Sequence, residues 1–272
     1  MPAEPEPGRT GALLGALLWR LRRERLRYLA LALIPFAATT ALTIVLPTVT
    51  GGAGVNGVDR IGGFGLRYGT HAGTLAVSIV LMIAPGLVAL FSAIGVASII
   101  RNLVGGEASR GGLEELLATP HSPAAIATAL LSVAAGLATT LWAAMTALGA
   151  LAVALTVLAS RDSATVSGAY LAVALILPLL AAWAGAGLSL MVNLLFPRLA
   201  QLGKTSALVN GGGLGNGLAL LPALGVFLTM STGAGLGPTT FLLTAGLATA
   251  AIAAGSVAAV ARGFRPEAVL ES

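Results

Sequence analysis

The sequence predicts an all-α membrane protein with six transmembrane helices. Hydrophobic residues make up 57% of the 272 residues and charged residues only 9%, whereas a soluble domain typically carries about 25% charged residues. Most of the surface must therefore face lipid, where only helices and closed barrels satisfy every backbone N–H and C=O. The apolar stretches are longer than the ~20 residues that cross a bilayer as a helix. They do not alternate with polar residues, which excludes a barrel.

Two different segments precede the first apolar stretch. Residues 1–10 are rich in proline and acidic residues, which predicts a disordered tail. In residues 11–27, Leu14, Leu18 and Leu21 share one helical face while arginines take another. This pattern predicts an amphipathic elbow helix in the headgroup layer. The alternative is a basic flank that only orients the first span.

Residues 11–272 are expected to form a single transmembrane domain. The six spans are predicted at residues 28–49, 73–100, 124–159, 169–196, 206–230 and 239–261. The third span is too long for one vertical crossing, so it is expected to tilt or to project beyond the bilayer.

The distribution of basic residues predicts the orientation of the chain. With the N-terminus inside, twelve of the fifteen basic residues fall in inner segments, and only Arg60, Arg67 and Arg161 fall in outer ones. The positive-inside rule therefore places both termini in the cytoplasm. The same distribution accounts for the basic charge without nucleic acid as a partner. The expected location is the plasma membrane.

The spans contain no Asp, Glu, Lys, Arg or His between their ends. Transporters driven by protons or sodium usually need such groups within the membrane, so any energy for transport is expected from a separate ATPase. The chain itself is not predicted to be an enzyme. The string before Gly203 and Lys204 places Arg198 where a phosphate-binding loop requires its first glycine. No metal site is expected, and cysteine is absent.

A glycine-rich stretch lies inside the fifth predicted span, from Asn210 to Gly217. The glycines are spaced for close packing between helices. The alternative is a flexible or broken helix along a substrate path.

The first inner segment carries the most distinctive pattern. Leu113, Leu116 and Leu117 share one face of a short predicted helix, and glutamates occupy the other. Thr119 and Pro120 end this helix, since the residue before proline avoids the α region. A helix that is apolar on one side and acidic on the other is typical of docking into the groove of a soluble partner. The alternative is a helix lying on the bilayer, which the adjacent glutamates disfavour.

This segment resembles the loop after the second span of the type-two ABC transporter permease family. The matching residues are Glu107, Gly111, Leu113, Glu114, Leu116, Leu117, Thr119, Pro120, Ser122 and Ile126. One departure is Gly112, where the family usually has threonine. The resemblance implies that residues 107–122 form a cytoplasmic coupling helix that seats in a nucleotide-binding ATPase subunit. It also implies a second permease subunit, identical or a sister chain, with ATP and Mg²⁺ bound by the ATPase and no cofactor bound here.

The sequence and the resemblance together predict the membrane-spanning subunit of an ATP-driven exporter. The polar residues expected along a substrate path are uncharged, namely Asn193, Asn210, Asn216, Thr139 and Thr140. They favour a hydrophobic or amphiphilic substrate such as a drug, antibiotic, lipid or peptide. Two alternatives are an ATP-independent secondary transporter and a membrane scaffold that transports nothing.

Overall fold

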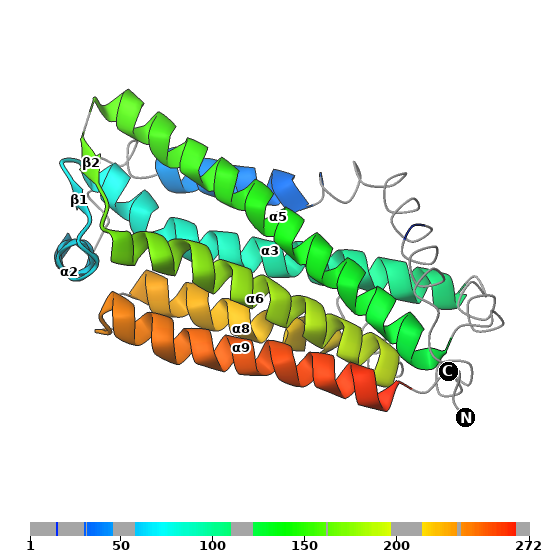
Figure 1. Ribbon diagram of the computed structural model, residues 1–272. Coiled ribbons are helices and arrows are strands. Elements are labelled where there is room, and N and C mark those ends of the chain that lie inside the picture. Colours follow the sequence, from blue (N-terminus) through cyan, green and yellow to red (C-terminus); the bar gives the residue numbers. More distant parts are fainter. Residues whose placement is uncertain are drawn as a thin grey trace.

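The computed structural model describes residues 15, 30, 32–45, 58–109, 122–161, 163–196, 214–232 and 235–264. In this part of the chain, long helices lie side by side and successive long helices run in opposite directions (Figure 1). In chain order the elements are a helical segment at Ala32–Val45, α2 (Val58–Tyr68), β1 (His71–Ala72), α3 (Leu75–Ser109), α5 (Pro123–Ser160), β2 (Ala164–Thr165), α6 (Gly168–Leu195), α8 (Leu214–Thr232) and α9 (Pro238–Gly263).

The predicted all-helical fold is confirmed for the described residues. Four helices, α3, α5, α6 and α9, are long and apolar enough to cross a membrane. The segment Ala32–Val45 and most of α8 are apolar but shorter. The expectation of an overlong third span agrees with α5, whose 38 residues correspond to about 57 Å of helix. The expected tail and elbow helix (residues 1–27) lie outside the described residues, apart from Gly15.

The centre of the bundle is α3. Of its apolar stretch, 72% is buried, against 22% for α5 and for α9. It packs against α5, α6 and α8. The segment Ala32–Val45 also contacts it, since the Phe36 and Phe91 rings meet edge to face with centroids 5.8 Å apart. Lipid therefore has most access to α5 and α9 at the periphery.

Short-range signals fix where two of the long helices begin. Ser122 and Ser167 have extended backbones. The Ser122 hydroxyl accepts a hydrogen bond from the backbone N–H of Ala125 at 3.2 Å, and the Ser167 hydroxyl accepts one from the backbone N–H of Tyr170 at 3.0 Å. Such N-caps satisfy amides that have no partner within the helix. The Ser167 hydroxyl also donates to the Tyr68 carbonyl at 2.6 Å, so one side chain joins the start of α6 to the end of α2.

Small residues bring α6 close to its neighbours. A Cβ on Gly185 would lie 3.1 Å from the Ala219 carbonyl oxygen of α8 and 3.1 Å from the Ala93 Cβ of α3. A Cβ on Gly187 would collide with Ser256 of α9. These are the close approaches that small residues permit between membrane helices. By contrast, Gly217, from the glycine-rich stretch, has open space beside it.

One end of the bundle carries a cap that the sequence did not predict. Part of the expected outer loop 50–72 is helical, as α2, and is followed by β1, which pairs antiparallel with β2 (Figure 1). Phe64 and Tyr68 of α2 are buried, stacked on each other with centroids 4.4 Å apart. Burial raises the pKa of the Tyr68 hydroxyl, while nearby Arg67 opposes the rise. The expected loop is therefore a packed cap over α3 and α6.

At the opposite end, helix α3 is longer than expected. The second span was predicted to end at residue 100, yet α3 continues to Ser109. Residues 101–109 are thus helical rather than loop, even though this stretch contains Gly105 and Gly106, which are poor helix formers. Glu107 belongs to the last turn of α3. The remainder of the expected coupling segment, residues 110–121, lies outside the described residues.

Candidate functional site

The permease-like segment is followed directly by α5, where two of its matching residues are described. Ser122 is the N-cap of α5, and Pro123 takes the first helical position, where its missing N–H costs nothing. Ile126 is 1% exposed and belongs to a core cluster that includes Ile100 of α3 and Leu194 of α6. The docking residues Gly111, Leu113, Glu114, Leu116, Leu117, Thr119 and Pro120 lie outside the described residues.

The residues expected along a substrate path do not share one surface. Asn193 is buried, and its amide donates to the Ser189 carbonyl of its own helix at 2.7 Å. Thr139 and Thr140 are exposed on α5, each donating to a carbonyl one turn earlier at 2.8 Å. Thr139 also accepts the Trp183 indole N–H at 3.0 Å, which links α5 to α6.

Asn216 and Asn210 are the other two residues expected along a substrate path, and no side-chain contact is described for either. Asn216 lies in the first turn of α8, and Asn210 lies outside the described residues. No cavity lined by several of the five is therefore described.

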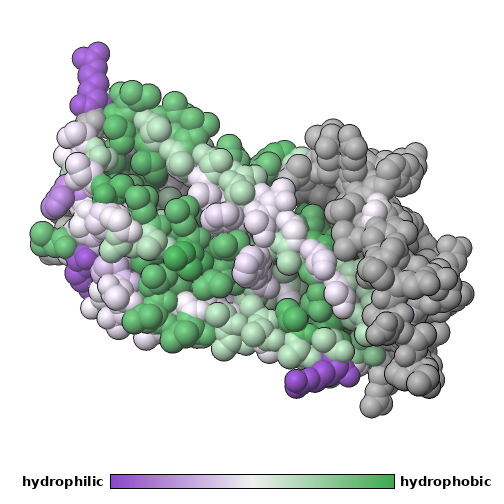
Figure 2. Space-filling view, in the orientation of Figure 1, coloured by the Kyte–Doolittle hydropathy of each residue, from purple (hydrophilic) through white to green (hydrophobic). Residues whose placement is uncertain are grey.

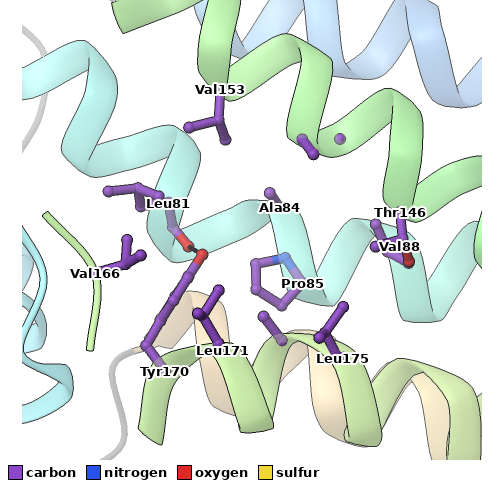
Figure 3. A pocket seen from close by; sticks show the side chains of 13 residues that line it. Leu81, Ala84, Pro85, Val88, Thr146, Val153, Val166, Tyr170, Leu171 and Leu175 are labelled. Carbon is purple, nitrogen blue, oxygen red and sulfur yellow. Dashed lines mark hydrogen bonds between the residues drawn. The ribbon is translucent and has the colours of Figure 1, made fainter. Parts of the chain in front are cut away.

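A cleft lies elsewhere, where α5 diverges from α6 over the surface of α3 (Figures 1 and 3). Its volume is about 230 Å³. The lining is made of small and aliphatic side chains with two hydroxyl groups, from Leu81, Ala84, Pro85, Val88, Thr146, Gly149, Ala150, Val153, Val166, Tyr170, Leu171, Ala174 and Leu175. It carries no charged side chain. Leu171 and Leu175 are more than 40% exposed, so the cleft opens sideways on the surface of the bundle.

A proline and a tyrosine shape one wall of this cleft. Pro85 has no N–H, so the Leu81 carbonyl, four residues earlier in α3, loses its helical partner. The Tyr170 hydroxyl donates to this carbonyl at 2.7 Å (Figure 3). A side chain of α6 thus replaces the missing bond of α3. The Tyr170 hydroxyl proton is used in this bond. The other hydroxyl among the lining side chains belongs to Thr146.

Charges lie away from this cleft. In the described residues, Asp, Glu, Lys, Arg and His occur only in α2, β1, the C-terminal part of α3, and the positions Arg161 and Arg262 near helix ends. Figure 2 shows the same arrangement on one face, with strongly hydrophilic residues near the ends of the described helices and hydrophobic ones between. The middle of the bundle offers dispersion contacts and hydroxyl groups, not ion pairs.

The sequence held a signal for this site that hydropathy alone does not reveal. Prolines inside the second and fourth predicted spans, Pro85 and Pro178, each free one backbone carbonyl. Tyr170 stands at the start of the fourth span. The pairing of Tyr170 with Leu81, 89 residues apart in the chain, needs the helix packing to be known.

Comparison of the chain with protein-family models, with curated proteins and with solved structures finds no match. The likeness to type-two permeases therefore rests on the segment between Glu107 and Ile126.

Proposed function

We propose that this chain is the membrane-spanning subunit of an ATP-driven ABC exporter for a hydrophobic or amphiphilic substrate. The observation that carries the proposal is the dense match between residues 107–126 and the coupling segment of type-two permeases. In this proposal the chain crosses the plasma membrane six times with both termini in the cytoplasm. It pairs with a second permease subunit and with ATPase subunits that bind ATP and Mg²⁺.

The position of α5 supports a mechanical role for the segment. α5 begins directly after the segment, at Pro123, and runs unbroken for 38 residues to Ser160. Its only proline is in the first turn, whereas α3, α6 and α8 contain internal prolines. An unbroken helix moves as one body, so a displacement at the segment would reach the cap at the far end.

The distribution of charge favours this proposal over a secondary transporter. In the described helices the carboxylates are Asp59 in the first turn of α2 and Glu107 in the last turn of α3, and the middle turns hold no carboxylate, lysine or histidine. Ion-coupled transporters usually place such groups at mid-membrane. The energy for uphill transport would then enter through the coupling segment.

The test is recruitment of the ATPase by a double variant, Leu116→Asp with Leu117→Asp. Burying two unpaired carboxylates in an apolar groove costs several kcal/mol, so pull-down of the ATPase should be lost. Glu114→Ala should have a smaller effect if that carboxylate meets a charge at the rim, where a pair contributes about 0–1 kcal/mol.

The matched control carries Leu66→Asp with His71→Asp, two exposed positions in the cap. It should recruit the ATPase normally, and protease mapping should show that both double variants insert like the wild type. Normal recruitment by the Leu116 and Leu117 variant would remove the basis of the proposal.

A further inference from the structure

We propose that α5 separates from α3 at a polar seam inside the bundle, formed by Ser92 of α3 with Trp142 and Thr146 of α5, and that water then reaches these side chains. This inference goes beyond the proposed export function, because it concerns a motion of the chain itself. It holds whether or not an ATPase drives that motion.

Ser92 lies on the face of α3 that packs against α5. It stands four residues after Val88 and three before Gly95, so the three residues share one helical face. A Cβ on Gly149 of α5 would lie 3.5 Å from Val88 Cγ2. A Cβ on Gly95 would lie 3.3 Å from Leu141 Cδ1 of α5. Because α3 and α5 run in opposite directions (Figure 1), the level of Ser92 on α5 falls between Leu141 and Gly149.

Both seam residues of α5 belong to this interval. Trp142 and Thr146 are four residues apart, so they share one face of α5. Thr146 lines the cleft together with Val88 of α3 (Figure 3), so this face of α5 borders α3. Ser92 lies one turn further along α3 than Val88. The seam therefore continues the cleft by one turn, away from the cap.

The three seam side chains bury polar atoms that have no hydrogen-bond partner among the described residues, namely Ser92 Oγ, Trp142 Nε1 and Thr146 Oγ1. By contrast, the exposed hydroxyls of Thr139 and Thr140 donate to carbonyls of α5 at 2.8 Å. A buried polar atom without a partner destabilises the packing that buries it. Contact between α3 and α5 is therefore weakened by three such atoms at one level of the bundle.

The helix α5 is loosely held beside the cleft. Of its apolar stretch 22% is buried, against 72% for α3, and no proline interrupts it after the first turn. The lining of the cleft already reaches from Thr146 to Val166, which follows β2 of the cap. When the cleft lengthens by one turn, water from the capped end hydrates the seam. The new hydrogen bonds then offset the lost contacts between the helices.

The experiment measures how fast a buried cysteine reacts with a water-soluble reagent, in the purified full chain in lipid nanodiscs. The chain has no cysteine, so Ser92→Cys introduces a single thiol. A charged methanethiosulfonate reacts with the thiolate, which needs water to form. The control is Ser256→Cys, at a serine that is also buried but lies between α6 and α9, against Gly187. We expect slow, measurable reaction at Ser92→Cys and about tenfold slower reaction at Ser256→Cys.

Three further variants test whether the seam polar groups favour the opening. Valine has the shape of threonine but no hydroxyl for water to bind. In the Thr146→Val background, the Ser92→Cys thiol should therefore react about fivefold more slowly, the equivalent of one hydrogen bond. Trp142→Phe should act in the same direction. Thr140→Val, whose hydroxyl bonds to its own helix, should leave the rate unchanged.

Thermal unfolding gives an independent readout of the same seam. Thr146→Val removes a buried polar atom that has no partner, so the melting temperature should rise by about 2–4 °C. Thr140→Val should not raise it. Equal reaction rates at Ser92→Cys and Ser256→Cys, an unchanged Ser92→Cys rate in the Thr146→Val background, or no rise in the melting temperature of Thr146→Val would each overturn the inference.

Discussion

At the scale of single residues, the bond between Tyr170 and the Leu81 carbonyl depends on the proline one turn further along α3. Tyr170→Phe leaves that carbonyl buried without a partner, so the variant should lose about 1–3 kcal/mol of unfolding free energy. In a Pro85→Ala background the new backbone N–H takes over the carbonyl, and the same Tyr170→Phe change should cost clearly less. Thermal unfolding in detergent of the wild type, both single variants and the double variant measures this coupling. Equal costs of Tyr170→Phe in both backgrounds would mean that the proline is irrelevant to the bond.

Close helix contact at Gly185 gives a second prediction at this scale. A methyl group here meets the backbone of α8 and the Cβ of Ala93, and neither moves without shifting a helix. Gly185→Ala should therefore destabilise the bundle by about 1–3 kcal/mol, the usual cost of overpacking. The matched control is Gly136→Ala in α5, where a Cβ meets nothing within 4 Å. That variant should be neutral or stabilising, because alanine is the better helix former. Equal melting temperatures for the two variants would contradict the packing described here.

At the scale of elements, the pairing of β1 with β2 ties the cap to the far end of α5. His71 lies opposite Thr165, and facing residues in an antiparallel pair have Cα atoms about 4.5–5.5 Å apart, within reach of a disulfide. The chain contains no cysteine, so His71→Cys with Thr165→Cys introduces only this pair. We expect it to form a disulfide under mild oxidation, measured as loss of reaction with a thiol reagent. A control pair, His71→Cys with Ala261→Cys, joins opposite ends of the bundle and should stay reduced.

The elements differ in how far the sequence determines them. Continuous apolar runs predicted α5, α6 and α9 to within two residues at each end, because lipid leaves few alternatives to a helix. The cap was not predicted, because α2 is short, contains three glycines, and has only part of its surface buried. Its stability comes from contacts of Phe64 and Tyr68 with residues distant in the chain. The cleft was missed for the same reason: it exists only where α5 leaves α6.

At the scale of the whole molecule, the proposed orientation in the membrane is open to a direct test. The cap is expected outside, and the end of α9 inside. A single cysteine at exposed position 71 should react with an impermeant thiol reagent in intact cells. One at exposed position 261 should react only after the cells are opened. The reverse pattern would place the coupling segment outside the cell, away from any ATPase.

Two of the prolines lie at nearly the same depth in the bundle. Gly185 and Ala93 are in contact; Pro178 lies seven residues before the first and Pro85 eight residues before the second. The neighbouring helices α3 and α6 thus each lack one backbone hydrogen bond at a common level, toward the capped end. Bending both helices at that level breaks no backbone bond at these two positions. The backbones of α3 and α6 therefore resist bending least at this level, where the capped third of the pair joins the rest of the bundle.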